Sequence, residues 1–269
     1  MDRARSRYQL TRSGRIDSVP SSYSLLAAPA ARARLREAAL SPGAHDQWPS
    51  GSFVGRLAAD DRVALLSAGT PIRFTDGQIL LVQGDAGDFL YVLVSGLVKV
   101  IVAASTGIET TLALRSRGDL VGEFALLDEQ PRTATARAVG EVATLRIGSA
   151  AFTAIAGESP AMQATVTRYL LAKMRAATER RAAERLWDAK ERLAQVLYEL
   201  ARVLGATNAA NGTVAIPITQ GDLGDLAGVA VSTAERVLAE LRRQKVISTG
   251  YREIVINDMA YLESIRFSS

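Results

Sequence analysis

The feature that most constrains the fold of this chain is a long stretch of helical periodicity that no glycine and no internal proline interrupts. It starts at Ser159-Pro160, where a serine N-cap followed by proline at the first helical position is a typical start signal, and it continues to Trp187, about 28 residues later. The apolar side chains in it step by three or four, at Met162, Val166, Leu170, Met174 and Ala177. A helix this long cannot bury its stripe against one small domain, so we expect a second copy of the chain to cover it. The alternative is a helix that lies along its own domain.

Before this helix the apolar period is two, which predicts β-strands. A helical pattern over Phe53–Ala68 ends at Gly69-Thr-Pro71, and short strand-like runs then follow one another as far as Ile147. Glycines separate these runs, as expected where turns require a positive φ. The eight predicted strands are Pro71–Phe74, Gly77–Val82, Asp88–Ser95, Leu97–Ala103, Thr110–Arg115, Gly118–Val121, Thr133–Val139 and Glu141–Ile147. This spacing favours a closed sandwich or jelly roll.

After the long helix the pattern is that of a winged helix-turn-helix. Thr219-Gln-Gly-Asp222 is a capping box with Asp in place of Glu, and it opens a helix. The predicted elements are a helix over Lys190–Leu204, a loop over Asn208–Gly212, a strand over Val214–Ile218, a helix through Ala227, a turn at Gly228, a helix over Val231–Gln244 and a hairpin over Val246–Ile256. Two helices joined by a tight glycine turn and followed by a hairpin are typical of this DNA-binding module.

The fold class is therefore α+β, and we predict four parts. They are a disordered Arg-rich tail over residues 1–50, a β-sandwich over 51–158, the long dimerisation helix over 159–187 and a winged helix-turn-helix domain over 188–269. An Arg- and Ser-rich start also resembles an organelle transit peptide, which stays as an alternative for the tail. No apolar run approaches the length of about 20 residues that a membrane span needs, so we expect a soluble, cytoplasmic protein with no membrane partner.

Charge is concentrated in the tail. Residues 1–50 carry eight of the 32 basic residues and four of the 28 acidic ones, which leaves 24 of each in the rest of the chain. Because the body is neutral, its affinity for nucleic acid must come from the placement of a few basic side chains and not from bulk charge.

Composition argues against enzyme activity. The chain has no Cys, which excludes disulfides and zinc–thiolate sites, and its one His, His45, leaves almost no room for a Ser-His-Asp triad. No phosphate-binding Gly-rich loop, nucleophile elbow or HExxH string occurs. We therefore expect no catalytic residue, no metal and no cofactor.

One string has the residues of a phosphate-binding turn. Gly118-Asp-Leu-Val-Gly-Glu-Phe-Ala-Leu-Leu127 is followed by Pro131-Arg-Thr-Ala-Thr135. Gly122 allows a close backbone approach, and the turn after it, which includes Phe124 and Ala125, can aim N–H groups at a phosphate. Arg132 can hold a phosphate through a charge-assisted hydrogen bond, Thr133 adds a hydroxyl, and Glu123 can accept from a ribose 2′-OH. The simpler interpretation is a turn with a surface Glu–Arg pair.

This string resembles the phosphate-binding cassette of cyclic-nucleotide-binding domains. With the long helix and the winged helix after it, residues 51–269 resemble the cyclic AMP receptor protein/FNR-type (Crp/Fnr) family of transcription regulators. The resemblance implies that Gly122, Glu123, Phe124, Ala125, Arg132 and Thr133 bind a cyclic nucleotide, and that Ala177 and Thr178 on the long helix meet its purine ring. Cyclic AMP is the expected ligand, with cyclic GMP as the alternative that Thr133 allows.

The same resemblance assigns DNA contacts. The implied residues are Lys190, Thr219, Gln220, Val231, Ser232, Thr233 and Arg236. The family's usual recognition helix begins Ser-Arg-Glu-Thr-Val-x-Arg, whereas this chain has Val231 and Ser232 where the family has its first Arg and its Glu. Thr233 and Arg236 match the pattern. A common operator sequence is therefore not expected, and Val231 can contact a thymine methyl instead.

The resemblance implies a homodimeric, ligand-responsive regulator that binds double-stranded DNA. RNA polymerase is a further partner that the resemblance allows. In such a regulator, a cyclic nucleotide shifts the dimer to a DNA-competent state through the junction at Trp187-Asp188. Two alternatives remain. The chain is either a ligand-independent DNA-binding regulator with a vestigial sensor, or a cyclic-nucleotide sensor that acts on a protein partner.

Overall fold

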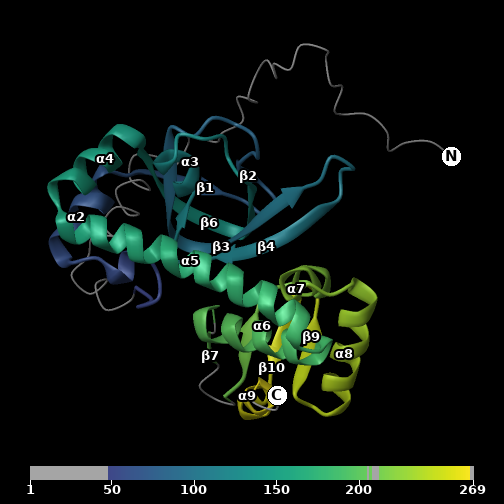
Figure 1. Cartoon of the computed structure of the whole chain (residues 1–269). Coiled ribbons are helices and arrows are strands. Elements are labelled where there is room, and N and C mark those ends of the chain that lie inside the picture. The colour runs from purple at the N-terminus through teal and green to yellow at the C-terminus, as the bar shows by residue number, and fades with distance from the viewer. Residues whose placement is uncertain (1–47, 205, 208–211, 267–269) are drawn as a thin grey trace.

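Two long antiparallel strands organise the first half of the chain in the computed structural model, which describes residues 48–204, 206–207 and 212–266. They are β3 (Phe89–Ala103) and β6 (Thr135–Gly148). Around them lie β1 (Thr70–Phe74) and β2 (Ile79–Leu81) against β6, and β4 (Glu109–Arg115) and β5 (Leu120–Val121) against β3. The sheet rolls into the predicted sandwich (Figure 1).

The predicted strand breaks at Gly96 and Gly140 are wrong, because β3 and β6 continue through them. Both glycines have a positive φ, and the pairing of β3 with β6 shifts register around Ser95. A β-bulge bends a strand without ending its hydrogen-bond ladder, so each pair of predicted strands is one long bent strand. At Gly96 a Cβ atom would lie 2.3 Å from the Glu141 carbonyl oxygen, which leaves room for glycine alone.

Two apolar layers hold the sandwich together. Inside the roll lie Phe74, Leu93, Val98 and Val121 among others. Outside it, helices cover one face of the sheet: a 3₁₀ turn (Val54–Arg56), α2 (Ala59–Ala68), α4 (Ser149–Glu158) and the start of α5 (Pro160–Leu186). Trp48 is 6% exposed in this outer core and stacks on the Arg117 guanidinium, so the sandwich begins before the predicted boundary at residue 51. Residues 1–47 of the predicted tail lie outside the described residues.

Two helical predictions in this half need correction. The pattern over Phe53–Ala68 forms two helical pieces, because Leu57 and Ala58 are extended. Arg62 supports this break by donating to the carbonyl oxygens of Val54 (3.2 Å) and Leu57 (2.9 Å). The sequence reasoning also missed α4, whose single fully buried side chain, Phe152, gives almost no periodic signal.

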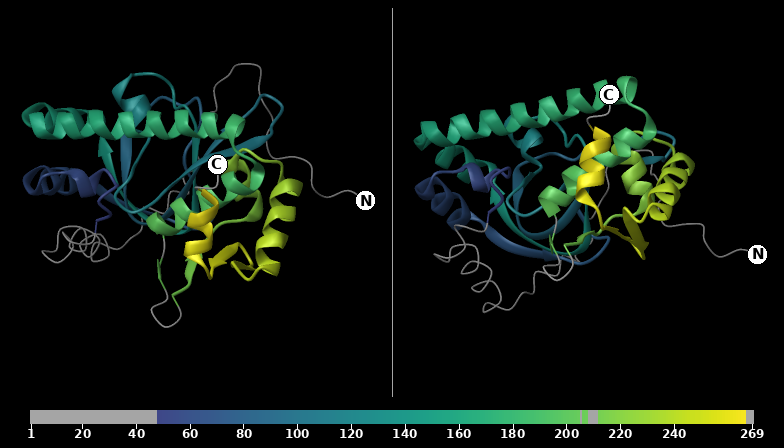
Figure 2. Two further views of the ribbon diagram at one scale, coloured as in Figure 1. Left: turned by 60° about the horizontal axis from the view of Figure 1, so that its bottom comes forward. Right: turned by 90° about the horizontal axis from the view of Figure 1, so that it is seen from below.

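The long helix α5 begins and ends as predicted. The Ser159 hydroxyl accepts from the Met162 N–H at 3.1 Å, and Pro160 occupies the first turn. The next helix, α6 (Ala189–Leu204), starts at a reciprocal cap, in which Asp188 and Glu191 each accept the other's backbone N–H at 2.8 Å. These caps fix the junction at Trp187-Asp188 as a sharp break. Figure 2 shows α5 running the length of the sandwich to the C-terminal domain.

The C-terminal domain is the predicted winged helix-turn-helix. After α6 come β7 (Ala206–Thr207), β8 (Val214–Ile216), α7 (Gln220–Ala227), α8 (Val231–Arg243), β9 (Ile247–Gly250), β10 (Glu253–Ile256) and α9 (Met259–Arg266). Gly228 is left-handed between α7 and α8, and the Thr219 hydroxyl caps α7 by accepting from the Asp222 N–H. The sequence reasoning missed α9 and β7. The predicted loop over Asn208–Gly212 lies, apart from Gly212, outside the described residues.

Polar contacts dock α7 and the wing on the sandwich. Asp222 accepts from Lys99 Nζ at 2.9 Å and from the Thr111 hydroxyl at 2.9 Å, and Asp225 accepts the Thr111 N–H at 2.9 Å. At the tip of the hairpin, Arg252 pairs with Asp76 at 2.8 Å. Burial raises the pKa of Asp222, but hydrogen bonds from Thr219 and Lys99 outweigh it and bring the pKa below its usual value. Asp222 therefore stays charged and holds the two domains together.

Candidate functional site: the cassette and the helix α5

The cassette forms a short turn whose geometry requires glycine. Gly122 has φ +89° and precedes the short helix α3 (Glu123–Leu127). A Cβ atom at Gly122 would lie 2.5 Å from Arg132 Nη1 and 2.7 Å from Leu81 Cδ1. Only a residue without a side chain fits there, so the approach of Arg132 to the turn depends on this position.

Arg132 is buried and turned into the cassette, with 3% of its surface exposed. Its two terminal nitrogens donate to the carbonyl oxygens of Gly122 and Phe89, both at 2.6 Å, and its guanidinium lies over the Phe89 ring. Burial lowers the pKa of Arg132, but an arginine remains charged at neutral pH even so. A buried guanidinium with unused N–H donors beside a pocket is suited to an anion.

Glu123 is also 3% exposed, and its partner comes from the long helix. Its Oε1 lies 2.5 Å from Lys173 Nζ, and Lys173 also donates to the Leu120 carbonyl oxygen at 3.4 Å. Burial lowers the pKa of Lys173 to about 8, although Glu123 opposes this shift. One turn earlier on α5, the Tyr169 hydroxyl accepts from the Leu120 N–H and donates to Asp119, both at 3.2 Å. Tyr169 and Lys173 thus fasten α5 to the cassette.

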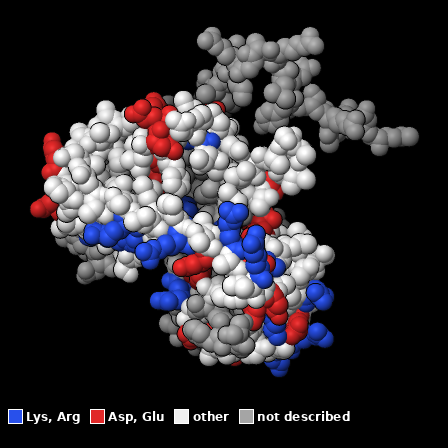
Figure 3. Space-filling view, viewed as in Figure 1, with Lys and Arg blue, Asp and Glu red and all other residues white. Residues whose placement is uncertain are grey.

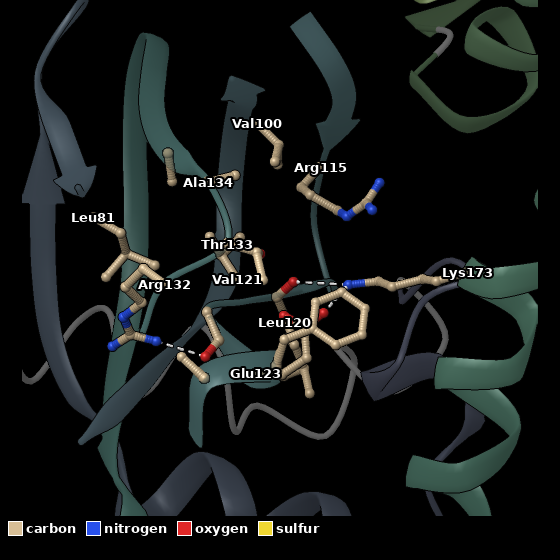
Figure 4. A pocket seen from close by; sticks show the side chains of 14 residues that line it. Leu81, Val100, Arg115, Leu120, Val121, Glu123, Arg132, Thr133, Ala134 and Lys173 are labelled. Atoms are coloured by element: carbon tan, nitrogen blue, oxygen red, sulfur yellow. Dashed lines mark hydrogen bonds and ion pairs between the residues drawn. The ribbon is translucent and has the colours of Figure 1, made fainter. Parts of the chain in front are cut away.

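Six of the predicted ligand residues line one pocket: Gly122, Glu123, Phe124, Ala125, Arg132 and Thr133 (Figure 4). The structure does not place Ala177 and Thr178 in it. Both are exposed further along α5, where the Thr178 hydroxyl bonds the Met174 carbonyl oxygen at 3.0 Å.

Two charged residues of the pocket, Arg115 and Lys173, were missed by the sequence reasoning. Lys173 lies one turn before Ala177 on the same helical face, a relation that the spacing could have shown. Arg115 lies two residues after the buried Ala113 on β4, so the strand period puts both on one face.

The pocket is almost filled by these side chains. Its volume is about 60 Å³, whereas pockets for small-molecule ligands are about 300–1,000 Å³. The Glu123–Lys173 pair lies on its α5 side in Figure 4, and Lys173 Nζ lies 5.8 Å from the centre of the Phe124 ring. A ligand of nucleotide size therefore requires α5 or Lys173 to move away from the cassette.

The predicted DNA-binding residues divide into exposed and occupied ones. Val231, Ser232 and Arg236 are exposed on α8, and Thr233 is half-buried. Thr219 caps α7, next to the half-buried Gln220. Lys190 pairs with Glu240 on α8 at 2.9 Å, and this contact joins α6 to the recognition helix. Basic side chains are visible over α8 in Figure 3.

Comparisons with known proteins agree with this architecture. The sequence profile of the cyclic nucleotide-binding domain matches residues 71–159, and that of the Crp-like helix-turn-helix domain matches residues 191–265. The cyclic AMP receptor protein of Thermus thermophilus is 31% identical over 195 residues, which cover 72% of this chain and 87% of that protein. The chain belongs to the Crp/Fnr family of transcription regulators.

Other members of the Crp/Fnr family support the same assignment. A CRP-like cAMP-activated global transcriptional regulator of Mycobacterium tuberculosis is 27% identical over 188 residues, covering 70% of this chain and 84% of that protein. The crystal structure of a CRP-family transcriptional regulator from Thermus thermophilus has a TM-score of 0.61 at 26% identity, covering 73% of this chain and 97% of that chain. Crp/Fnr proteins are DNA-binding regulators and not enzymes, as the sequence predicted.

Neither a membrane-spanning helix nor a metal site is found among the described residues. None of their helices is both long and apolar enough to cross a membrane. In the same part of the chain, no group of three or more His, Cys, Asp and Glu side chains could hold a metal ion.

The Glu123–Lys173 pair predicts a pH dependence of stability. Because the pKa of Lys173 falls to about 8 from 10.5, the unfolded chain holds more protons between these values, and the free energy of unfolding rises with pH there. The contribution is at most about 1.4 kcal/mol per pH unit. Denaturant unfolding from pH 8 to 9.5 should show this rise in the native protein and lose it in the neutral double variant Glu123→Gln/Lys173→Met.

Lys190→Met is the matched control for that experiment. The hydrogen bond to Glu240 raises the pKa of Lys190, so its removal should leave the slope between pH 8 and 9.5 unchanged. Equal slopes in the native protein and the neutral double variant would show that Lys173 does not titrate in this range.

Proposed function

We propose that this protein is a homodimeric regulator in which a cyclic nucleotide, bound between the cassette and α5, raises the affinity of the winged helices for DNA. The observation that carries the proposal is the Glu123–Lys173 contact, since it ties the pocket to the long helix. A ribose 2′-OH at Glu123 competes with Lys173 for the same carboxylate. Ligand binding therefore changes how α5 is held.

Contacts at the far end of α5 reach the DNA-binding domain. A Cβ atom at Gly228, in the turn between α7 and α8, would lie 2.9 Å from a carboxylate oxygen of Glu184 on α5. Arg192 on α6 donates to the Gly228 carbonyl oxygen at 3.1 Å. A shift of α5 is thus transmitted to the helix-turn-helix, on the route that the Trp187-Asp188 junction predicts.

The closed pocket favours a second candidate function. In a ligand-independent regulator, Lys173 would permanently neutralise Glu123, and the carbonyl oxygens of Gly122 and Phe89 would permanently satisfy Arg132. Calorimetry with cyclic AMP and cyclic GMP separates the two functions, because heat of binding is expected from the first and none from the second.

The first prediction concerns the phosphate. Arg132→Ala should lower cyclic-nucleotide affinity roughly 30- to 1,000-fold, because it removes a charge-assisted hydrogen bond in a buried site. The control is Arg137→Ala on β6, which removes an ion pair with Glu109 on β4 and should leave the affinity for the cyclic nucleotide unchanged. Because Arg132 also bonds two carbonyl oxygens, the melting temperature of the variant without ligand is measured alongside. A folded Arg132→Ala protein with unchanged affinity would refute the cassette assignment.

The second prediction concerns the dimer. Of the predicted seam, Val166 packs against the sandwich, whereas Met174 is 62% exposed. Met174→Glu should therefore leave the monomer folded and place two charges in an apolar seam by symmetry, so that sedimentation shows a monomer. Val63→Glu, on α2 at 44% exposure, is the control and should stay dimeric. A dimeric Met174→Glu protein would move the interface elsewhere.

The third prediction concerns DNA. Arg236→Ala should lose about 1–3 kcal/mol per half-site and relax the preference at one base pair, because an exposed Arg on the recognition helix can bond guanine bidentately. Arg243→Ala, at the end of α8, should weaken all sequences alike if it affects binding at all. Titrations against a selected site and its single-base variants measure both. Equal loss on every sequence would make Arg236 a phosphate contact.

A further inference from the structure

The charges of the pocket are arranged in a fixed order. Figure 4 shows Arg132 on one side, the Glu123 carboxylate in the middle, and Arg115 with Lys173 on the side of α5. If the phosphate of the proposed ligand lies at Arg132 and its ribose at Glu123, the base extends toward Arg115. What Arg115 recognises therefore decides which base fits.

Arg115 is a half-buried cation that the described residues leave uncompensated. Its one hydrogen bond among them goes from Nη1 to the Leu114 carbonyl oxygen at 2.9 Å, and none of their carboxylates pairs with it. Two further cations lie near it, since the charge of Arg115 lowers the pKa of both Lys173 and Arg180, although burial is the larger cause of each shift. Four N–H donors of a planar fork thus remain for a group outside the described chain.

The two purines offer this fork different edges. Guanine presents N7 and O6 side by side, two acceptors that an arginine meets with two parallel hydrogen bonds. Adenine presents N7 beside an N6 amino group, whose donors oppose those of Arg115. Lys173 adds more donors at the same end, which strengthens the preference for an edge made of acceptors.

Resting on the proposed function, the geometry points to Arg115 as the residue that reads the base, and to a purine with a carbonyl at C6 as the ligand's base. Cyclic GMP is then preferred over cyclic AMP, the reverse of the ligand expected from the resemblance. Arg115 acts here as a specificity residue: it contacts the base edge and leaves the phosphate to Arg132.

Calorimetry with three nucleotides on the full-length protein tests this inference. Cyclic GMP should bind about 5- to 150-fold more tightly than cyclic AMP, the range of one bidentate contact. Cyclic IMP shares O6 and N7 with guanine and lacks the N2 amino group, so it should bind like cyclic GMP. If cyclic IMP binds only as weakly as cyclic AMP, the N2 group is being read and the assignment to Arg115 is overturned.

Variants at Arg115 separate recognition from simple charge. Arg115→Leu should abolish the preference for cyclic GMP, and Arg115→Lys, which keeps the charge without the fork, should lose most of it. Arg73→Leu, an exposed arginine on β1, is the control and should keep the native ratio. An unchanged ratio in Arg115→Leu, or a change in sedimentation with an unchanged ratio, would assign Arg115 to another role such as a contact with a second chain.

The outcomes also separate this inference from the proposed function. If the native protein binds cyclic AMP as tightly as cyclic GMP or more tightly, the inference fails and the proposed function stands. If neither nucleotide binds, both fail. Loss of both affinities in Arg132→Ala, with loss of the ratio alone in Arg115→Leu, supports both.

Discussion

The ion pair between Glu123 and Lys173 is the contact on which the rest of the site depends. It joins the cassette to the long helix at 2.5 Å, in a place from which water is almost excluded. Removing one partner of a buried pair leaves an uncompensated charge, at a cost of about 3–5 kcal/mol. A ligand that displaces Lys173 from Glu123 must therefore supply another hydrogen-bond acceptor for the Lys173 ammonium group. A hydrogen-bond acceptor on the base of the proposed ligand could accept from Lys173. The identity of the ligand and the position of α5 are then linked.

Contacts hold the DNA-binding domain at two places, and the proposed control by the pocket would act through them. One is the end of α5, where Glu184 meets the turn at Gly228. The other is the surface of the sandwich, where Asp222 accepts from Lys99 and from Thr111 on β4, the strand that ends in Arg115. Both routes start from elements that line the pocket. Under the proposed function, the ligand and the DNA each favour one of two positions of α5.

Short sequence motifs correctly predicted the structure of the segments that contain them. The caps at Ser159 and Thr219 and the left-handed Gly228 place α5, α7 and the turn before α8, and the cassette string brings its six residues to one pocket. The predicted strand ends at Gly96 and Gly140 are wrong, because a glycine with a positive φ can bend a strand as well as end it. Both of these glycines lie within continuous strands. Lys173 lies beside the cassette because α5 packs against the sandwich, and Arg115 lies beside it because β4 is part of the rolled sheet. No motif contains either residue, so only the tertiary structure joins them to Glu123.

If the pocket and the DNA surface are coupled as proposed, each ligand must change the affinity for the other by the same factor, and calorimetry can measure that factor. Cyclic GMP is titrated by calorimetry into the free protein and into the protein saturated with a selected DNA site. If the ligand favours the DNA-competent state, the affinity for cyclic GMP rises in the complex by the same factor by which cyclic GMP raises the affinity for DNA, about 5- to 150-fold for a typical coupling. Equal affinities in the two titrations, with binding present in both, would show that the pocket and the DNA surface are not coupled.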